Sequence, residues 1–463
     1  MLDKIRHKIV TIINKLQPTQ IMVIGFAFII LVGAFLLNLP ISSQNGESTG
    51  FLNSLFTATS AVCVTGLIVV DTGTHWSLFG QSIIILLIQI GGLGFMTTAT
   101  MFALIAKKKI NLKERFLIQE SLHQFDLSGL IKLTRHVLII TFTIELLGAF
   151  ILSTEFVPQL GLTKGIWLSI FHSISAFCNA GFDLMGSVSG PFTSLTSYVN
   201  NFTVSATISI LILLGGIGFP VIVEILKVKK LKKFKKMSVH ARIVLIATSL
   251  ITLLSTALLF IVEFSNNKTI GNLPIGHKLL ASLFQSVTAR TAGFNTYDLA
   301  LMSHSGIFIM IILMFIGASP ASTGGGIKTT TLTTIILYVR ASILGKNDTE
   351  IFGRRLDSST TKKSMGIFFT VIALVSSGTL LLTIVQPEFT LIEAWFEVMS
   401  ALTTAGLSIG GSPTLNSIGK LLIICFMFIG RVGSLTIFLA FVSKHSKNKN
   451  VHIRYPEEKI LVG

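Results

Sequence analysis

The sequence predicts an all-α polytopic membrane protein built from four tandem helix–pore loop–helix repeats around one central pore. Three observations support this fold class: an apolar composition, a one-sided distribution of basic residues, and a glycine-containing tetrad that occurs four times. Of the 463 residues, 51% are hydrophobic and only 12% are charged, with a mean hydropathy of +0.77. Segments such as 21–39 and 82–104 carry no charge and are long enough to cross a hydrocarbon core of about 30 Å. Composition therefore overrides the usual expectation of several soluble domains at this length.

Basic residues predict the orientation of the chain. They concentrate in the termini and in the loops between repeats, as in 107–109 and 227–236. Because cytoplasmic segments carry the excess of Lys and Arg, both termini of this multi-pass protein are predicted to be cytoplasmic. The segment 227–236 is either an orientation signal beside anionic lipid or a docking surface for a cytosolic partner. This distribution argues against nucleic-acid binding despite the net charge of +17, and the polar segment 1–20 argues against a signal peptide.

The most informative pattern is the tetrad, which has glycine at its third position. The four glycines are separated by 115, 112 and 113 residues. Each tetrad follows a short apolar run rich in Ser and Thr and precedes a long hydrophobic segment. Rings of backbone carbonyls select ions in channel filters, and the tetrads have that character. The predicted ion-binding residues, which would hold the ion mainly through backbone carbonyls, are Val64, Thr65, Gly66, Asn179, Ala180, Gly181, Thr291, Ala292, Gly293, Thr404, Ala405 and Gly406.

Glycine suits such a filter for two physical reasons. It adopts backbone angles that other residues avoid, and it leaves no side chain in the bore. A helix that ends at the tetrad would also direct its negative dipole end toward a cation. One glycine of this kind would carry no information, but four at matched spacing indicate a repeated filter.

The tetrads divide the chain into four repeats, each predicted as a long helix, a short re-entrant helix, the tetrad and a second long helix. The re-entrant helices are predicted at 50–63, 165–178, 278–290 and 390–403. The full predicted division is a cytoplasmic segment 1–20, repeat one 21–106, a loop 107–131, repeat two 132–226, a basic loop 227–242, repeat three 243–339, a loop 340–364, repeat four 365–443 and a cytoplasmic tail 444–463.

The second long helices share a run of small residues. The sequence IGGLGF at 90–95 matches LGGIGF at 214–219, and repeats three and four have IGASP at 316–320 and IGRVG at 429–433 at the corresponding place. Small residues here predict either close helix packing or a bend that opens onto a cavity.

Repeat three differs most, because its second segment is too long for one span. Residues 305–339 would form a straight helix of roughly 52 Å, and the sequence GASPASTGGG at 317–326 disfavours a helix. Non-helical backbone at membrane depth persists only where it is buried or lines a cavity. We therefore expect an intramembrane loop beneath the filter. The predicted gate residues are Gly317, Ser319, Pro320, Ser322, Thr323, Gly324, Gly325, Gly326, Lys328 and Arg431.

Charged residues inside hydrophobic segments need partners or a cavity. Arg431 is predicted to face a conduction path as part of the gate, with Glu145 or Glu224 as its partner. Lys328 is either a helix-end anchor or part of the gate. Arg290 is predicted to brace the re-entrant helices through Glu393 or Glu397. The acids after the tetrads are predicted either to be solvated loop residues or to line a vestibule that concentrates cations; they are Asp71, Asp183 and Asp298. The cysteines are predicted to pack in apolar surroundings without a disulfide or metal; they are Cys63, Cys178 and Cys425.

These motifs together resemble the Trk/Ktr/HKT superfamily of cation transporters, and within it most closely the membrane subunits of bacterial Ktr systems. The stretches that carry the resemblance are AVCVTGL (61–67), SAFCNAGF (175–182), VTARTAGF (287–294), TGGGIK (323–328) and IGRVG (429–433). The resemblance implies potassium-selective uptake across a bacterial plasma membrane, with the four glycines as selectivity residues and the loop with Arg431 as the gate. It also implies a homodimer on a cytosolic ring of nucleotide-binding subunits. Some plant relatives with Ser at the first filter position favour sodium, so Gly66 favours potassium.

Other classes of protein fit less well. The segment 324–329 lacks the spacing of a phosphate-binding loop, so no nucleotide or other cofactor is expected in this chain, and potassium is the expected substrate. A membrane enzyme would need a cluster of His, Asp or Glu at one membrane face, and none is evident. A secondary transporter with alternating access remains the main rival, although such proteins usually have inverted rather than parallel repeats. Sodium permeation is a variant of the leading interpretation.

Overall fold

The computed structural model describes residues 18–94, 97–98, 100–101, 130–227, 236–433 and 458. Most of the predicted segments 1–20, 107–131 and 444–463 lies outside the described residues, as do residues 228–235 of the basic loop.

The described residues form helices and one small antiparallel hairpin, β1 (Glu350–Ile351) with β2 (Arg354–Arg355). Four of these helices are long and apolar enough to cross a membrane, and a bent pair can count as a fifth span. Helices satisfy all their backbone hydrogen bonds internally, as a bilayer requires. The predicted class, an all-α membrane protein, is confirmed. The four long helices are α2 (Pro18–Leu37), α8 (Leu130–Leu160), α13 (Val239–Glu263) and α17 (Ser358–Val385).

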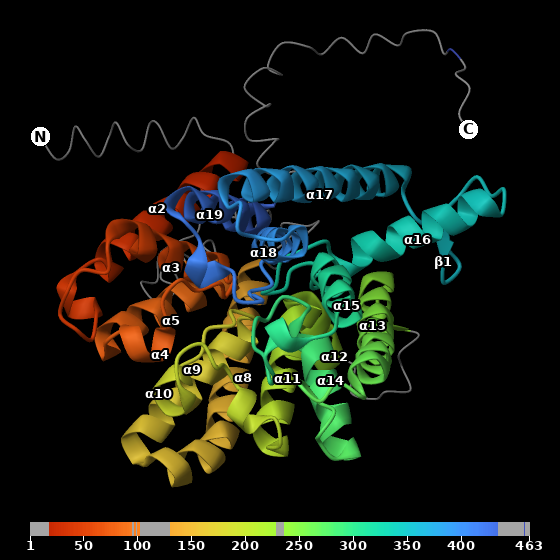
Figure 1. Ribbon diagram of the computed structural model, residues 1–463. Helices are drawn as coiled ribbons and strands as arrows, with labels where there is room; N and C mark the ends of the chain where they lie inside the picture. Colours follow the sequence, from red (N-terminus) through yellow and green to blue (C-terminus); the bar gives the residue numbers. More distant parts are fainter. Residues whose placement is uncertain are drawn as a thin grey trace, which may run out of the picture.

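Each long helix is followed by a shorter helix, a tetrad and a further apolar helix. The short helices, here called the tetrad helices, are α3 (Phe51–Cys63), α9 (Leu162–Phe177), α14 (Ile275–Thr288) and α18 (Leu391–Thr403). The second helices are α5 (Leu78–Leu93), α11 (Phe202–Ile217), α15 (His304–Phe315) and α19 (Ser417–Val432). Figure 1 shows the four groups following one another around the molecule in sequence order.

Contacts between these groups form a closed circle. Every second helix packs against the tetrad helix of the next repeat: α5 on α9, α11 on α14, α15 on α18, and α19 back on α3. Within each repeat, the tetrad helix also packs on its own long helix. This arrangement brings the C-terminal ends of all four tetrad helices toward the centre.

The helices α5, α11 and α19 end at Leu93, Ile217 and Val432, inside the predicted repeats. They stop before Gly94, Gly218 and Gly433, whose φ angles are 83°, 97° and 94°. A left-handed residue cannot continue a right-handed helix. At Gly218 the chain bends by 98° into α12 (Phe219–Lys227).

The same run of small residues also allows close packing. A Cβ atom on Gly91, Gly215 or Gly430 would collide with a carbonyl oxygen near the end of the tetrad helix of its own repeat. The predicted close packing therefore occurs at one glycine, and the glycine three residues later ends the helix, with a sharp bend in repeat two. That such a bend opens onto a cavity stays a prediction.

The remaining elements connect these helices. In repeat three, α15 is followed by a loop and then by α16 (Thr329–Ile343), which leads to the hairpin. Helices α8 and α17 begin at Leu130 and Ser358, within the predicted loops 107–131 and 340–364, because they include polar residues that hydropathy alone does not assign to a membrane span. Short helices precede or follow the tetrads at η1 (Pro40–Ser42), α4 (Thr72–His75), α10 (Gly186–Ser189), η2 (Thr196–Tyr198), η4 (Leu299–Leu301) and η5 (Ser412–Thr414).

Candidate functional site

The glycines of the four tetrads meet at the centre of the molecule and form what we call the glycine ring. A Cβ atom on Gly66 would lie 2.6 Å from the carbonyl oxygen of Ala180 and 3.2 Å from the Cα of Gly406. A Cβ atom on Gly406 would in turn collide with the carbonyl oxygen of Thr65. The first tetrad is thus in contact with both the second and the fourth.

The other half of the ring repeats this geometry. A Cβ atom on Gly181 would lie 2.6 Å from the carbonyl oxygen of Ala292 and 2.8 Å from the Cα of Gly293. A Cβ atom on Gly293 would lie 3.3 Å from the carbonyl oxygen of Ala405. Each glycine therefore faces the carbonyl of the second residue in a neighbouring tetrad, and the ring closes only because none of the four positions has a side chain.

All four tetrads have the same unusual backbone. The first residues, Val64, Asn179, Thr291 and Thr404, have φ angles of 55°, 59°, 73° and 51°. The third residues are the ring glycines, with φ angles of 99°, 71°, 87° and 79°. A left-handed conformation is a genuine outlier for β-branched residues such as valine and threonine. Its occurrence four times in one register means that the surrounding structure imposes it, as is common at functional sites.

The tetrad helices hold the tetrads through backbone hydrogen bonds. The N–H groups of Thr65, Ala180 and Ala405 each donate over 2.8 Å to a carbonyl five residues earlier, while Ala292 donates to Thr288 over 2.9 Å. The third tetrad is therefore attached with a different offset from the other three.

Hydroxyl groups of the same helices fix the backbone around the glycines. Ser60 Oγ accepts from the N–H of Gly66 at 3.1 Å. Ser175 Oγ and Thr288 Oγ1 each donate over 2.7 Å to the carbonyl just after their glycine. The Asn179 amide is satisfied when its nitrogen donates to the carbonyls of Ala176 and Ile212. These side chains are buried behind the ring, which leaves backbone atoms to line it.

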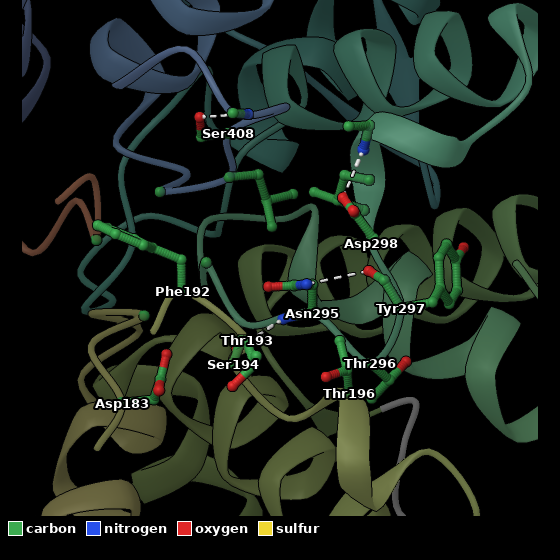
Figure 2. Close-up of a pocket in the computed structure, with 18 of the residues that line it drawn as sticks. Asp183, Phe192, Thr193, Ser194, Thr196, Asn295, Thr296, Tyr297, Asp298 and Ser408 are labelled. Carbon is green, nitrogen blue, oxygen red and sulfur yellow. Dashed lines mark hydrogen bonds between the residues drawn. The ribbon is translucent and has the colours of Figure 1, made fainter. Parts of the chain in front are cut away.

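A cavity of about 720 Å³ opens onto the glycine ring from the side where the tetrads continue into loops. We call it the mouth cavity, and Figure 2 shows the side chains that line it. All four ring glycines border it, and its charged lining residues in the described part of the chain are Asp183, Lys268 and Asp298. The cavity has the position and the carboxyl groups to receive a cation.

The three acids that follow the tetrads have different roles. Asp183 is partly exposed in the mouth cavity, and Asp298 also lines it while its Oδ1 accepts from the N–H of Ala300. Asp71 is buried, and its Oδ2 accepts from the N–H of Phe192 at 2.8 Å. Asp183 and Asp298 therefore line the cavity that opens onto the ring, whereas Asp71 holds a loop through its hydrogen bond to Phe192.

The loop that contains Phe192 is a feature that the sequence did not predict. Phe192 and Ser194 have φ angles of 61° and 47°. The N–H of Leu195 donates to the carbonyl of Asn295 at 3.0 Å, and the N–H of Asn295 donates to Ser194 Oγ. The loop is thus tied to repeats one and three, and Figure 2 shows Phe192 and Ser194 beside the mouth cavity. The paired positive φ angles had no signal in the sequence, because neither residue is glycine.

On the opposite side of the glycine ring lies the broken-helix loop, residues 316–328, between α15 and α16. The N–H groups of Gly317 and Ala318 donate to the carbonyls of Ile327 and Gly325 at 3.0 and 3.2 Å. The predicted break in the long segment of repeat three is therefore present. Other hydrogen bonds within the loop join Ser319 to Thr329 and Ser322 to Ser319.

Glycines of the broken-helix loop touch two tetrads directly. A Cβ atom on Gly324 would collide with Thr291 Oγ1, and one on Gly325 would collide with Thr404 Oγ1. The N–H of Thr323 donates to the carbonyl of Gly215 at 3.2 Å. The loop therefore lies under the third and fourth tetrads and is also attached to the second repeat.

Arg431 lies on α19 and holds this loop. Its Nη1 donates to the carbonyl of Thr323 at 2.5 Å, and its Nη2 donates to the carbonyl of Gly91. The predicted carboxylate partners are wrong: Glu145 accepts from Gln89, and Glu224 accepts from the N–H and hydroxyl of Ser238. Helix ends and broken helices expose carbonyl oxygens at membrane depth, and these acceptors can satisfy a guanidinium without a carboxylate.

Lys328 is a helix-end anchor, as one of the two predicted alternatives holds, and its part in a gate stays a prediction. It is the N-cap residue of α16, and its Nζ donates to the carbonyl of Gly324 at 2.7 Å. The lysine thus anchors a helix end and closes the broken-helix loop on itself.

The prediction that Arg290 contacts Glu393 or Glu397 is wrong. Nη1 of Arg290 donates to Thr252 Oγ1 of α13 at 3.3 Å, because the side chain turns toward the long helix of its own repeat. Glu393 caps its own helix through Thr390, and Glu397 accepts from serines after the fourth tetrad. The cysteines are unpaired, and two of them, Cys63 and Cys178, are buried behind the ring.

Comparison with known proteins gives the family. A profile of the TrkH family, described as cation transport proteins, matches residues 16–453. The chain therefore belongs to this family, and it is a membrane protein of the cation transporter class. The family resemblance predicted from the motifs is confirmed.

Individual relatives show which transporters within this family the chain is similar to. The chain is 43% identical over 97% of both chains to the Ktr system potassium uptake protein B of Bacillus subtilis (strain 168). It is 41% identical to the potassium/sodium uptake protein NtpJ of Enterococcus hirae, over 97% of this chain and 98% of the relative. The crystal structure of the potassium transporter TrkH from Vibrio parahaemolyticus has the same fold, with a TM-score of 0.70 at 17% identity over 90% of this chain and 84% of that chain.

Asp183 gives the mouth cavity a charge that depends on pH. Burial in the cavity wall and then the neighbouring Asp71 raise the pKa of Asp183 to about 7. The carboxyl is therefore mostly neutral at pH 6 and mostly ionised at pH 8. Because a carboxylate concentrates cations, uptake into proteoliposomes at subsaturating cation should rise about two- to threefold between these pH values.

The matched control for this prediction is Asp298→Asn, which removes a carboxyl from the same cavity and keeps the pH dependence. Asp183→Asn should abolish it. A wild-type profile that is flat from pH 6 to pH 8 would contradict the prediction.

Proposed function

We propose that this chain mediates potassium uptake across the bacterial plasma membrane, with the glycine ring as the centre of its selectivity filter. The observation that carries the proposal is the closed contact of four glycines, each against the carbonyl of a neighbouring tetrad. Two relatives that cover nearly the whole chain are named as potassium uptake proteins, one of them also for sodium, which supports the same conclusion.

The chemistry follows from the backbone. A potassium ion that enters the ring loses water, and inward-facing carbonyl oxygens replace it. Carbonyls of Thr65, Ala180, Ala292 and Ala405 lie at the ring and are the expected ligands. The tetrad helices end at the ring, so their dipoles favour a cation there. Potassium is thus the transported substrate, and no catalytic residue or resident cofactor is involved.

Sodium-permeable or ion-coupled transport is the second candidate function, and one observation favours it: the relative NtpJ is named a potassium/sodium uptake protein. Gly66 leaves the carbonyl of Ala180 free to face the ring, because a side chain at this position would collide with it, and this fits the potassium-selective candidate. The four repeats also have the same element order, whereas ion-coupled carriers usually contain inverted repeats.

The gate we propose consists of the broken-helix loop with Arg431. The loop contacts the third and fourth tetrads from below, and Arg431 places a positive charge beside it. A fixed cation in a low-dielectric path repels other cations. Opening then requires the loop to move, with α16 as the connection to a cytosolic regulator.

Selectivity can be tested at the ring. Gly66→Ser and Gly293→Ser should weaken potassium uptake and reduce the preference for potassium over sodium by about tenfold, because a side chain displaces carbonyl ligands. The measurement is competitive rubidium and sodium uptake in proteoliposomes. Gly46→Ser, in a loop where a Cβ meets nothing within 4 Å, is the control. An unchanged ion ratio in both ring variants would refute the filter.

The gate is tested without any regulator. Arg431→Ala, or removal of part of the segment 317–326, should raise uptake by the membrane subunit alone by about tenfold while the potassium preference changes little. Lys420→Ala, which removes a lysine that bonds Asn53 far from the loop, is the matched control. If correctly inserted Arg431 and loop variants remain as inactive as the wild type, the gate lies elsewhere.

Assembly is the third part of the proposal. The chain is expected to form a homodimer in the lipid bilayer, each protomer with its own pore, and to dock through its basic cytoplasmic loops on a ring of nucleotide-binding subunits. Both termini are then cytoplasmic. Mass measurement after purification in mild detergent should give a dimer. A monomer that responds to nucleotide without another subunit would contradict this prediction.

A further inference from the structure

One position of the tetrad helices differs in chemistry among the four repeats although its place is the same. It lies nine residues before the ring glycine and is occupied by Thr57, His172, Phe284 and Glu397. All four side chains are at most 1% exposed. A position this buried behind the ring can influence the tetrad without touching the ion.

Glu397, in repeat four, accepts two hydrogen bonds from the segment that follows its tetrad. Its Oε1 accepts from the hydroxyl of Ser408, and its Oε2 accepts from the hydroxyl of Ser412 at 2.6 Å. A Cβ atom on Gly411 would lie 3.0 Å from Glu397 Oε1, so the backbone of the segment also packs on the carboxyl. Residues 408–412, which we call the fourth mouth segment, therefore fold around one buried carboxyl group.

Ser408 extends this contact into the mouth segment. Its Oγ accepts from the N–H of Gly410 at 3.1 Å and from the N–H of Ser412 at 3.4 Å. Ser408, which Figure 2 shows beside the cavity, lines the mouth cavity together with Gly410 and Ser412 and with Gly406 and Leu407 directly before them. Glu397 is thus connected through one hydroxyl to the wall that a cation meets before it reaches the ring.

The other repeats hold this wall differently. His172 Nε2 accepts from the N–H of Leu184 at 3.4 Å while Nδ1 donates to the carbonyl of Leu168. Thr57 Oγ1 donates to Asn53 within its own helix, and Phe284 has no polar atom to contribute. Only repeats two and four therefore use this position to fix the segment after the tetrad, and the stronger acceptor, a carboxyl group with two hydroxyl donors, is in repeat four.

We propose that Glu397 is a positioning residue for ion selectivity, which acts by fixing the fourth mouth segment and thereby the carbonyls of the fourth tetrad. The inference rests on the proposed filter function and adds a specific residue behind it. A filter discriminates between cations only if its carbonyls keep their separation, and hydrogen bonds to a carboxylate are stronger than those between neutral groups. Loss of this acceptor frees the segment that directly follows Gly406.

The test uses the full-length protein in its native assembly, with separate measurement of KM and maximal rate for potassium and for sodium. Glu397→Ala should raise the KM for potassium about tenfold, with a smaller change for sodium, so that the ratio of the two constants falls. Glu397→Gln retains one acceptor oxygen and should give an intermediate ratio. Maximal rates should change less than the KM ratio.

The same substitutions at Glu393 are the matched control. Glu393 lies one turn earlier on α18, is partly exposed and bonds only Thr390 at the start of its own helix. Glu393→Ala and Glu393→Gln should leave the KM ratio within about twofold. Ser408→Ala combined with Glu397→Ala should give no more than the larger single effect, since both act on one contact.

Two outcomes would overturn the proposal. One is an unchanged KM ratio in both folded Glu397 variants; the other is an equal loss of maximal rate for both ions with unchanged KM, which marks a purely structural role. If Glu397→Ala does not fold, Glu397→Gln and Ser412→Ala decide. Gly66→Ser, measured alongside, distinguishes failure of this inference from failure of the proposed filter. If the KM ratio changes in Gly66→Ser but not in the Glu397 variants, only the inference about Glu397 is refuted. If the KM ratio changes in none of these variants, the filter itself is refuted.

Discussion

The structure depends on one steric constraint, the approach of four backbones so close that none can carry a Cβ atom. At each ring glycine, an added Cβ would meet the carbonyl of a neighbouring tetrad at 3.3 Å or less. The residue two positions earlier must also be left-handed, and three of these four residues are β-branched. Such a conformation costs free energy at each tetrad. It persists because the tetrad helices, their hydroxyl groups and the neighbouring repeats all fix the same geometry.

Helix packing sets the dimensions of this ring. Each second helix packs on the tetrad helix of the next repeat, and α19 returns to α3, so that the circle has no free edge. Glycines at 91, 215 and 430 bring these helices against the ends of their own tetrad helices, while α5, α11 and α19 end two residues further on. The position of the carbonyls therefore follows from contacts distributed over all four repeats rather than from the tetrads alone.

The predictions that succeeded can be read directly along the chain. Hydropathy and the run GASPASTGGG predicted the class and the break in repeat three, and the resemblance of the tetrad motifs predicted the family. The partners of Arg431 and Arg290 could not be predicted in the same way, because both bond to groups on other helices that become available only after folding. The helix ends at Gly94 and Gly433 were missed since glycine is also common inside membrane helices.

Fusion of four repeats into one chain permits differences that a symmetric tetramer could not have. Among the residues that the structure describes, the broken-helix loop occurs in repeat three and lies under the third and fourth tetrads, and the carbonyl of Thr323 accepts a hydrogen bond from Arg431 of repeat four. Four copies of this loop would compete for the same space below the ring. The differences at the position nine residues before each glycine follow the same logic, with a carboxyl group in repeat four and a phenyl ring in repeat three. The four tetrads thus share one backbone conformation at the ring, while the side chains that support them differ from repeat to repeat.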